Sequence, residues 1–274
     1  MSALIDAVAQ CDRSVFLALN HLARSRFMDW LMPRATDAGL GHVQAIAVLT
    51  VGIACALRAR RIAWKSSLRR GCLFGVLLGA ALALLRVAAP GAGVLGHAPA
   101  SALFAGGFAV ALWASFAAPA ARAERWWVGP VLLALALSGL GATALKRIPR
   151  DRPWWYYEQR RQEGRDLAVH VETVPGVHPL KLSGFPSGHT ATTVAMAAAV
   201  TVLFRRRRRA LVAAVWAGAA LVAFSRIYLG SHWPLDLVGG GALGAACGVA
   251  SVWLCRKWAH APGAAPPGTA RGIE

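Results

Sequence analysis

Residues 126–145 read WWVGPVLLALALSGLGATAL, twenty residues without a charged side chain. A hydrocarbon core about 30 Å thick requires roughly 20 such residues of a helix that crosses it. Their Gly, Ala and Ser content suits close packing of helices in lipid. Six more segments are long and apolar enough to span, namely residues 39–57, 71–89, 98–121, 188–204, 210–227 and 235–255. The sequence therefore predicts an all-α integral membrane protein, a bundle of about seven transmembrane helices.

The composition agrees with this fold class. Of the 274 residues, 57% are hydrophobic and 15% charged, and the formal net charge is +18. A disordered or nucleic-acid-coating protein would carry such a charge on a polar background rather than between long apolar runs. We therefore expect membrane lipids, and not nucleic acid, as partners of this chain.

The chain divides into four parts by polarity. Residues 1–38 mix Asp and Arg with apolar positions, which predicts an N-terminal amphipathic, interfacial segment, or else an eighth span or a re-entrant pair. Residues 39–125 hold the N-terminal transmembrane helices. Residues 126–257 hold the last four spans and a long polar loop at 146–187. Residues 258–274, rich in Ala, Pro and Gly, are expected to be disordered.

The loops alternate in charge along the chain. One set is rich in Arg and Lys, at residues 58–70, 122–125, 205–209 and 256–257. The positive-inside rule places that set in the cytoplasm. The other set, which includes the loop 146–187, then faces the periplasm, and we predict a multi-pass protein of a bacterial inner membrane.

One carboxylate stands out in the second half of the chain. Between Thr173 and Ile273 the only acidic residue is Asp236, at the mouth of an apolar segment, where a charge is costly unless paired. His232 lies four residues earlier, so the two side chains could share one helix face. An Asp that accepts from one imidazole nitrogen fixes the tautomer and raises the basicity of the other. We predict that Asp236 orients His232 as a nucleophile or base.

An anion site is predicted at the same face. Ser187 resembles a helix N-cap with Gly188 just inside, and a helix start offers unpaired N–H groups to a phosphate. Lys146, Arg152 and Arg226 lie at neighbouring helix ends on this face and add cationic donors. These residues together describe a site for a phosphoryl group.

No metal or cofactor is predicted. The five cysteines form no Cys-x-x-Cys pair, which indicates neither a disulfide framework nor a zinc site. No set of carboxylates has the pattern of a Mg²⁺ site.

These residues resemble a known family. The run Pro186-Ser187-Gly188-His189, then Ser225-Arg226 after thirty-five residues, then His232 and Asp236, is similar to the second and third signatures of the type 2 phosphatidic acid phosphatase (PAP2) superfamily. The resemblance covers about residues 126–255 and points to the bacterial membrane lipid phosphatases, with a six-helix core.

The first signature of that family departs from its usual spacing here. The family pattern is Lys, six residues, then Arg-Pro, whereas only five residues separate Lys146 from Arg152. Strict register places Leu145 at the lysine position, so either Lys146 or Arg150 supplies the charge. We expect Lys146.

The resemblance also implies roles. His232 would take the phosphoryl group as a phosphohistidine, Asp236 would orient it, and His189 would protonate the leaving oxygen. The residues implied to hold the phosphate oxygens are Lys146, Arg152, Ser187, Gly188 and Arg226.

The leading hypothesis is a metal-independent phosphatase of lipid phosphates or pyrophosphates. Candidate substrates implied by the resemblance are undecaprenyl pyrophosphate, phosphatidylglycerol phosphate, phosphatidic acid and lipid A phosphates. The alternatives are a lipid phosphotransferase of the same superfamily and a non-catalytic lipid- or anion-binding or transport protein. The sequence does not predict the oligomeric state.

Overall fold

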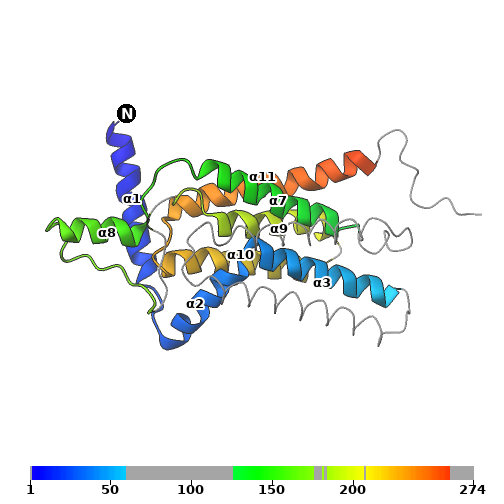
Figure 1. Ribbon diagram of the computed structural model, residues 1–274, viewed down its shortest axis with the longest axis horizontal. Coiled ribbons are helices and arrows are strands. Elements are labelled where there is room, and N and C mark those ends of the chain that lie inside the picture. The colour runs from blue at the N-terminus through cyan, green and yellow to red at the C-terminus, as the bar shows by residue number, and fades with distance from the viewer. Residues whose placement is uncertain (1, 60–125, 176–180, 182–183, 207, 260–274) are drawn as a thin grey trace, which may run out of the picture. The chain divides into compact units, whose positions relative to one another are not determined.

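The computed structural model describes residues 2–59, 126–175, 181, 184–206 and 208–259, and within those residues all regular secondary structure is helical. The helices in chain order are α1 (Ser2–Asn20), α2 (Arg26–Ala38), α3 (Gly41–Ala59), α7 (Val128–Leu145), α8 (Pro153–Gln162), α9 (Gly188–Phe204), α10 (Arg209–Tyr228) and α11 (Pro234–Ala259) (Figure 1).

Five of the seven expected spans fall on these residues. Each is a helix, and each begins within two residues of the expected position. Among the described residues α7, α10 and α11 are long and apolar enough to cross a membrane, while α9 is a shorter apolar helix. The expected spans at 71–89 and 98–121 lie outside the described residues, so the count of seven stays a prediction.

The chain forms two compact units. One contains residues 1–45 and 130–274, and the other contains residues 46–129. Every residue of the expected phosphoryl site belongs to the first unit. The four-part division by polarity stays a prediction.

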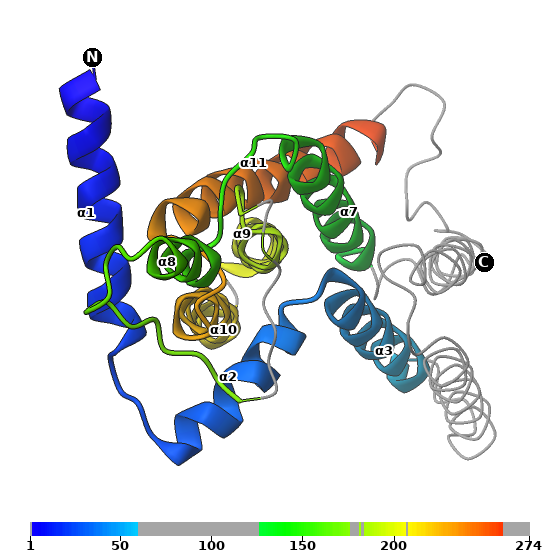
Figure 2. The same ribbon diagram turned by 60° about the vertical axis from the view of Figure 1, so that its left-hand side comes forward.

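The centre of the first unit is the contact between α9 and α11. Three glycines of α11, four residues apart, face the backbone of α9. A β-carbon at Gly240 would lie 2.5 Å from the Ser187 carbonyl oxygen, and one at Gly248 would lie 2.5 Å from that of Ala195. Small residues at such positions let helix backbones approach closely in lipid. Figure 2 looks nearly along α9 and shows it between α10 and α11.

The N-terminal segment forms two helices, α1 and α2. α1 ends at Asn20, and Ser25 caps α2 by accepting the Met28 N–H at 3.2 Å. α1 runs across the end of the bundle rather than along it (Figure 1). The buried Asn20 amide donates to the carbonyl oxygens of Ile227 and Tyr228 at 2.9 and 3.1 Å, which fixes α1 to the end of α10.

The loop 146–187 contains α8, a helix that the sequence did not predict. Pro153 starts it, as suits the first turn of a helix. Tyr157 from α8 and Phe16 from α1 pack with Trp233 in one apolar cluster. This cluster holds α8 and α1 against the turn that leads into α11.

We predict that Gly244→Ala lowers the thermal unfolding midpoint of the protein in detergent. A β-carbon there would overlap the Ala191 carbonyl oxygen and lie 3.0 Å from the Ala195 nitrogen, both backbone atoms of α9. Overpacking of this kind costs about 1–3 kcal/mol. The matched control is Gly241→Ala, three residues earlier on a side of α11 where a β-carbon would meet no described atom within 4 Å. Equal unfolding midpoints for the two variants would contradict the close contact between α9 and α11.

Candidate active site

His232 and Asp236 lie at the turn from α10 into α11. Asp236 is fully buried, and its Oδ2 accepts the Trp233 N–H at 2.9 Å and lies 3.3 Å from His232 Nδ1. A carboxylate only accepts hydrogen bonds, so Nδ1 carries the proton and Nε2 keeps its lone pair. The structure thus brings together the two side chains that the sequence pairs.

The environment keeps His232 uncharged. Burial, and then the positive charges of Arg226, Arg152 and Lys146, hold the pKa of His232 well below its ordinary value. The imidazole is therefore neutral at neutral pH. A neutral imidazole with one nitrogen held by a carboxylate and the other unprotonated is the form that attacks an electrophile.

Two buried arginines lie in this site. Arg152, just before α8, is 4% exposed, and its NH1 lies 3.3 Å from His232 Nε2. Arg226, in the last turn of α10, is 8% exposed, and its Nε has no hydrogen-bond partner among the described residues. Because an unsatisfied buried donor costs free energy, this Nε suits a site that receives an anion.

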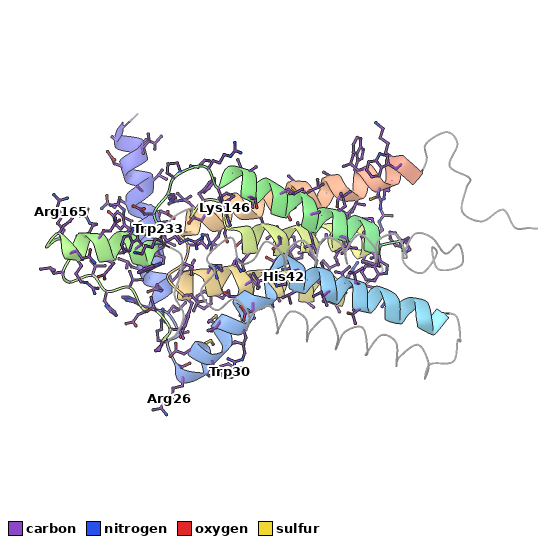
Figure 3. The ribbon with its side chains drawn as sticks, in the orientation of Figure 1. Arg26, Trp30, His42, Lys146, Arg165 and Trp233 are labelled. Carbon is purple, nitrogen blue, oxygen red and sulfur yellow. The ribbon has the colours of Figure 1, made fainter. Side chains whose placement is uncertain are left out.

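The structure distinguishes between Arg150 and Lys146, the two candidates for the positive charge of the first signature. Arg150 donates to Asp12 at 2.5 Å and to Asp236 at 2.6 Å, so both ends of its guanidinium are engaged. The Lys146 Nζ lies 3.9 Å from where a β-carbon of Gly188 would stand, and it makes no side-chain hydrogen bond within the described part of the chain. The Lys146 ammonium group therefore lies close to the start of α9, where it can contact an anion bound to that helix end. Figure 3 shows Lys146 at the end of the helix bundle that is nearer α8.

The start of α9 has the expected N-cap. Ser187 Oγ accepts the Thr190 N–H at 3.4 Å and the Thr190 hydroxyl at 3.0 Å. The first N–H groups of a helix have no partner inside it, and Gly188 carries no side chain that would shield them. The Ser187 N–H donates to the Asp236 carbonyl oxygen at 3.0 Å, which ties this helix start to that of α11.

α2 also lines the site, which the sequence did not predict. A β-carbon at Gly39, directly after α2, would lie 3.3 Å from His189 Cδ2. The Thr36 hydroxyl accepts from Arg226 NH1 at 3.3 Å and lies 2.6 Å from the Ser225 hydroxyl. No motif marks Thr36 or Gly39 in the sequence. The third signature is thus held in place by an N-terminal helix.

The sequence from α7 to α11 matches a known family. Residues 127–260 match the model of the PAP2 superfamily. We call residues 127–260 the PAP2 region. The PAP2 region contains every residue of the three signatures, from Lys146 to Asp236.

Known relatives match part of the chain. The chain is 33% identical to the lipid A 1-phosphatase of Rhizobium johnstonii over 122 residues, which are 43% of this chain and 44% of that protein. It is 37% identical to the lipid A 4′-phosphatase of Porphyromonas gingivalis over 79 residues, which are 29% of this chain and 32% of that protein. The chain matches less than half the length of these relatives.

Two solved structures also align with the chain. Aquifex aeolicus LpxE gives a TM-score of 0.48 at 22% identity, over 88% of this chain and 93% of that chain. The PAP2 type phosphatidylglycerolphosphate phosphatase of Bacillus subtilis gives 0.45 at 17% identity, over 93% and 90% of the two chains. The similarity to the PAP2 superfamily rests on the matched sequence.

We predict an alkaline loss of activity that depends on Lys146. Burial, and then the positive charges of Arg152 and Arg226, lower the pKa of Lys146. As pH rises through this lowered pKa the ammonium loses its proton, so the attraction for a phosphate falls at a lower pH than an ordinary lysine would allow. The measurement is kcat/KM for phosphate release against pH, which reports the groups of the free enzyme.

The conservative variant Lys146→Arg is the control for this prediction. A guanidinium stays charged throughout the accessible pH range, so the alkaline limb should move to higher pH. An alkaline limb at the same pH in both proteins would exclude Lys146 as its source.

Proposed function

We propose that the protein is a lipid phosphatase that passes a phosphoryl group from a membrane lipid to His232 and then to water, without a metal ion. The observation that carries this proposal is the state of His232. Its imidazole is buried and neutral, Nδ1 is held by Asp236, and Nε2 lies beside Arg152. A nucleophile is thus placed next to cations that can hold its target.

In the first step Nε2 of His232 attacks the phosphorus atom of the lipid phosphate. The P–N bond forms as the P–O bond to the lipid breaks, and the electron pair of that bond leaves with the lipid oxygen. Asp236 stabilises the positive charge that develops on the imidazole. His189 donates a proton to the leaving oxygen, and the bound phosphate supplies the negative charge that lets His189 hold this proton beforehand.

In the second step a water molecule attacks the phosphorus of the phosphohistidine. His189, now neutral, takes a proton from the water, the P–N bond breaks, and its electron pair returns to Nε2. Inorganic phosphate leaves and His232 regains its lone pair. The sum of the two steps is lipid phosphate plus water to lipid alcohol plus phosphate.

Fixed donors supply the rate enhancement. Charge in phosphoryl transfer spreads over three equatorial oxygens, and pre-oriented donors stabilise it without reorganisation. The guanidinium groups of Arg152 and Arg226 offer paired N–H donors to these oxygens, and Lys146 adds a point charge. Ser187 and Gly188 contribute through the start of α9.

Lipid A phosphates are the first substrates to test. Both relatives named above act on lipid A, one at the 1-phosphate and one at the 4′-phosphate. We place the site at the periplasmic face of a bacterial inner membrane, because the Arg-rich loops alternate with the loops that carry the site residues. Undecaprenyl pyrophosphate, phosphatidylglycerol phosphate and phosphatidic acid complete the panel.

We predict that the purified protein releases phosphate from at least one of these lipids in detergent with EDTA present, and that His232→Ala abolishes the release. The wild type should also take up an acid-labile label from a ³²P-lipid, and the variant should not, since only His232 forms the P–N bond. His170→Ala, a histidine of the polar loop with a side chain 65% exposed, is the matched control and should keep both activities.

The other outcomes identify the alternatives. Normal release by His232→Ala would overturn the mechanism. Label that reaches a second lipid instead of solution would indicate a phosphotransferase. Binding of the lipids with neither label nor phosphate release would indicate a non-catalytic binding or transport protein.

A further inference from the structure

An ion pair lies directly behind the catalytic carboxylate, and half of it comes from outside the PAP2 region. Asp12, in α1, is 4% exposed and accepts from Arg150 NH2 at 2.5 Å. The other end of the same guanidinium donates to Asp236 Oδ1 at 2.6 Å. Asp236 Oδ2 faces His232 Nδ1. The chain of contacts therefore runs from α1 to the proposed nucleophile.

Asp12 has a second contact that fixes its position. Its Oδ1 accepts the Leu235 N–H at 2.9 Å, in the first turn of α11. One carboxylate of α1 thus binds the start of α11 and the arginine that binds Asp236. This arrangement sets Arg150 between two carboxylates whose positions are both determined by α11.

We propose that Asp12 and Arg150 are positioning residues that keep Asp236 ionised and thereby keep His232 in the tautomer with a free Nε2. The proposal deepens the proposed function and rests on it. Neither residue touches the substrate; both act through Asp236.

The reason is the cost of a buried charge. Asp236 is fully buried, and a carboxylate in such a place takes up a proton unless a cation compensates it. A protonated carboxyl group would donate its O–H to His232 Nδ1. The imidazole proton would then move to Nε2, and the lone pair that attacks phosphorus would be lost. Arg150 supplies the compensating charge.

Asp12 is needed because Arg150 is not held by Asp236 alone. The Arg150 side chain is 28% exposed, so an unpaired end of its guanidinium can turn towards solvent. The planar fork of arginine reaches two carboxylates at once, which a lysine cannot do in the same geometry. With Asp12 in place, both ends of the fork are fixed and Arg150 stays on Asp236.

The test uses Asp12→Asn, Arg150→Met and the double variant in the full-length protein. The Asn side-chain oxygen can still accept the Leu235 N–H, so Asp12→Asn removes the ion pair while keeping the helix cap. The matched controls are Asp6→Asn and Arg147→Met, which remove the same charges at exposed positions of α1 and of the loop after α7. Size-exclusion profiles of all variants check that they fold.

Two readouts are taken on each protein. Ring ¹⁵N signals of histidine-labelled protein, assigned with His232→Gln, report the tautomer of His232 without any substrate. Phosphate release from the best lipid gives kcat and KM.

We expect the proton of His232 to lie on Nδ1 in the wild type and both controls, and on Nε2 in Asp12→Asn and Arg150→Met. We expect kcat to fall by at least about 10-fold with KM nearly unchanged; the upper bound is about 10⁴-fold, the loss seen when a triad histidine is held in the wrong tautomer. The double variant should be no slower than Arg150→Met, because residues that act in series are not additive. Asp12→Glu should restore much of the rate.

Other results overturn the proposal. A wild-type tautomer and rate in Asp12→Asn would exclude Asp12, and multiplied losses in the double variant would show that the two residues act independently. If Arg150→Met fails to fold, the comparison of Asp12→Asn with Asp12→Glu decides the matter. If the tautomer moves as expected but the wild type releases no phosphate from any lipid, the positioning role stands and the phosphatase proposal fails.

Discussion

The burial of the Asp236 carboxylate is the constraint on which the site depends. A fully buried negative charge requires donors on every side, and the protein supplies them from several segments. Arg150 donates from the polar loop, the Trp233 N–H from the turn before α11, and His232 Nδ1 from the same turn. The Asp236 carbonyl oxygen accepts the Ser187 N–H at the start of α9. Asp236 therefore fixes the proposed nucleophile, His232, and the start of α9 relative to each other.

The glycine contact between α9 and α11 allows the starts of these two helices to lie this close together. Gly240 stands one turn after Asp236 and faces the Ser187 carbonyl oxygen, where a β-carbon would be only 2.5 Å away. A larger residue there would push the two helix starts apart and lengthen the hydrogen bond from Ser187 to Asp236. The packing of small residues in the bundle thus determines the geometry at its end. In this protein, helix packing and the chemistry of the site depend on the same backbone approach.

What the sequence could predict was local. Apolar runs predicted the helix positions, and Ser187 before Gly188 at the start of one run predicted the helix cap. The four-residue spacing predicted the contact of His232 with Asp236, although His232 lies in the turn just before α11 rather than on the same helix. The contact of Arg150 with Asp12 joins residues 138 positions apart, and that of Arg226 with Thr36 joins residues 190 apart. No periodicity specifies such pairs. They depend on how α1 and α2 pack across the end of the bundle.

The cations of the site also differ in the negative groups that they neutralise. Arg150 is used by the protein itself, because it compensates Asp12 and Asp236. Burial, and then the positive charges of Arg152 and Arg226, lower the pKa of Lys146, so these three cations repel one another. Their repulsion is relieved most by the ligand with the greatest negative charge. A terminal phosphate carries up to two charges and a phosphodiester only one, so we expect the proposed site to prefer lipids whose phosphate or pyrophosphate group is terminal over ordinary diester phospholipids.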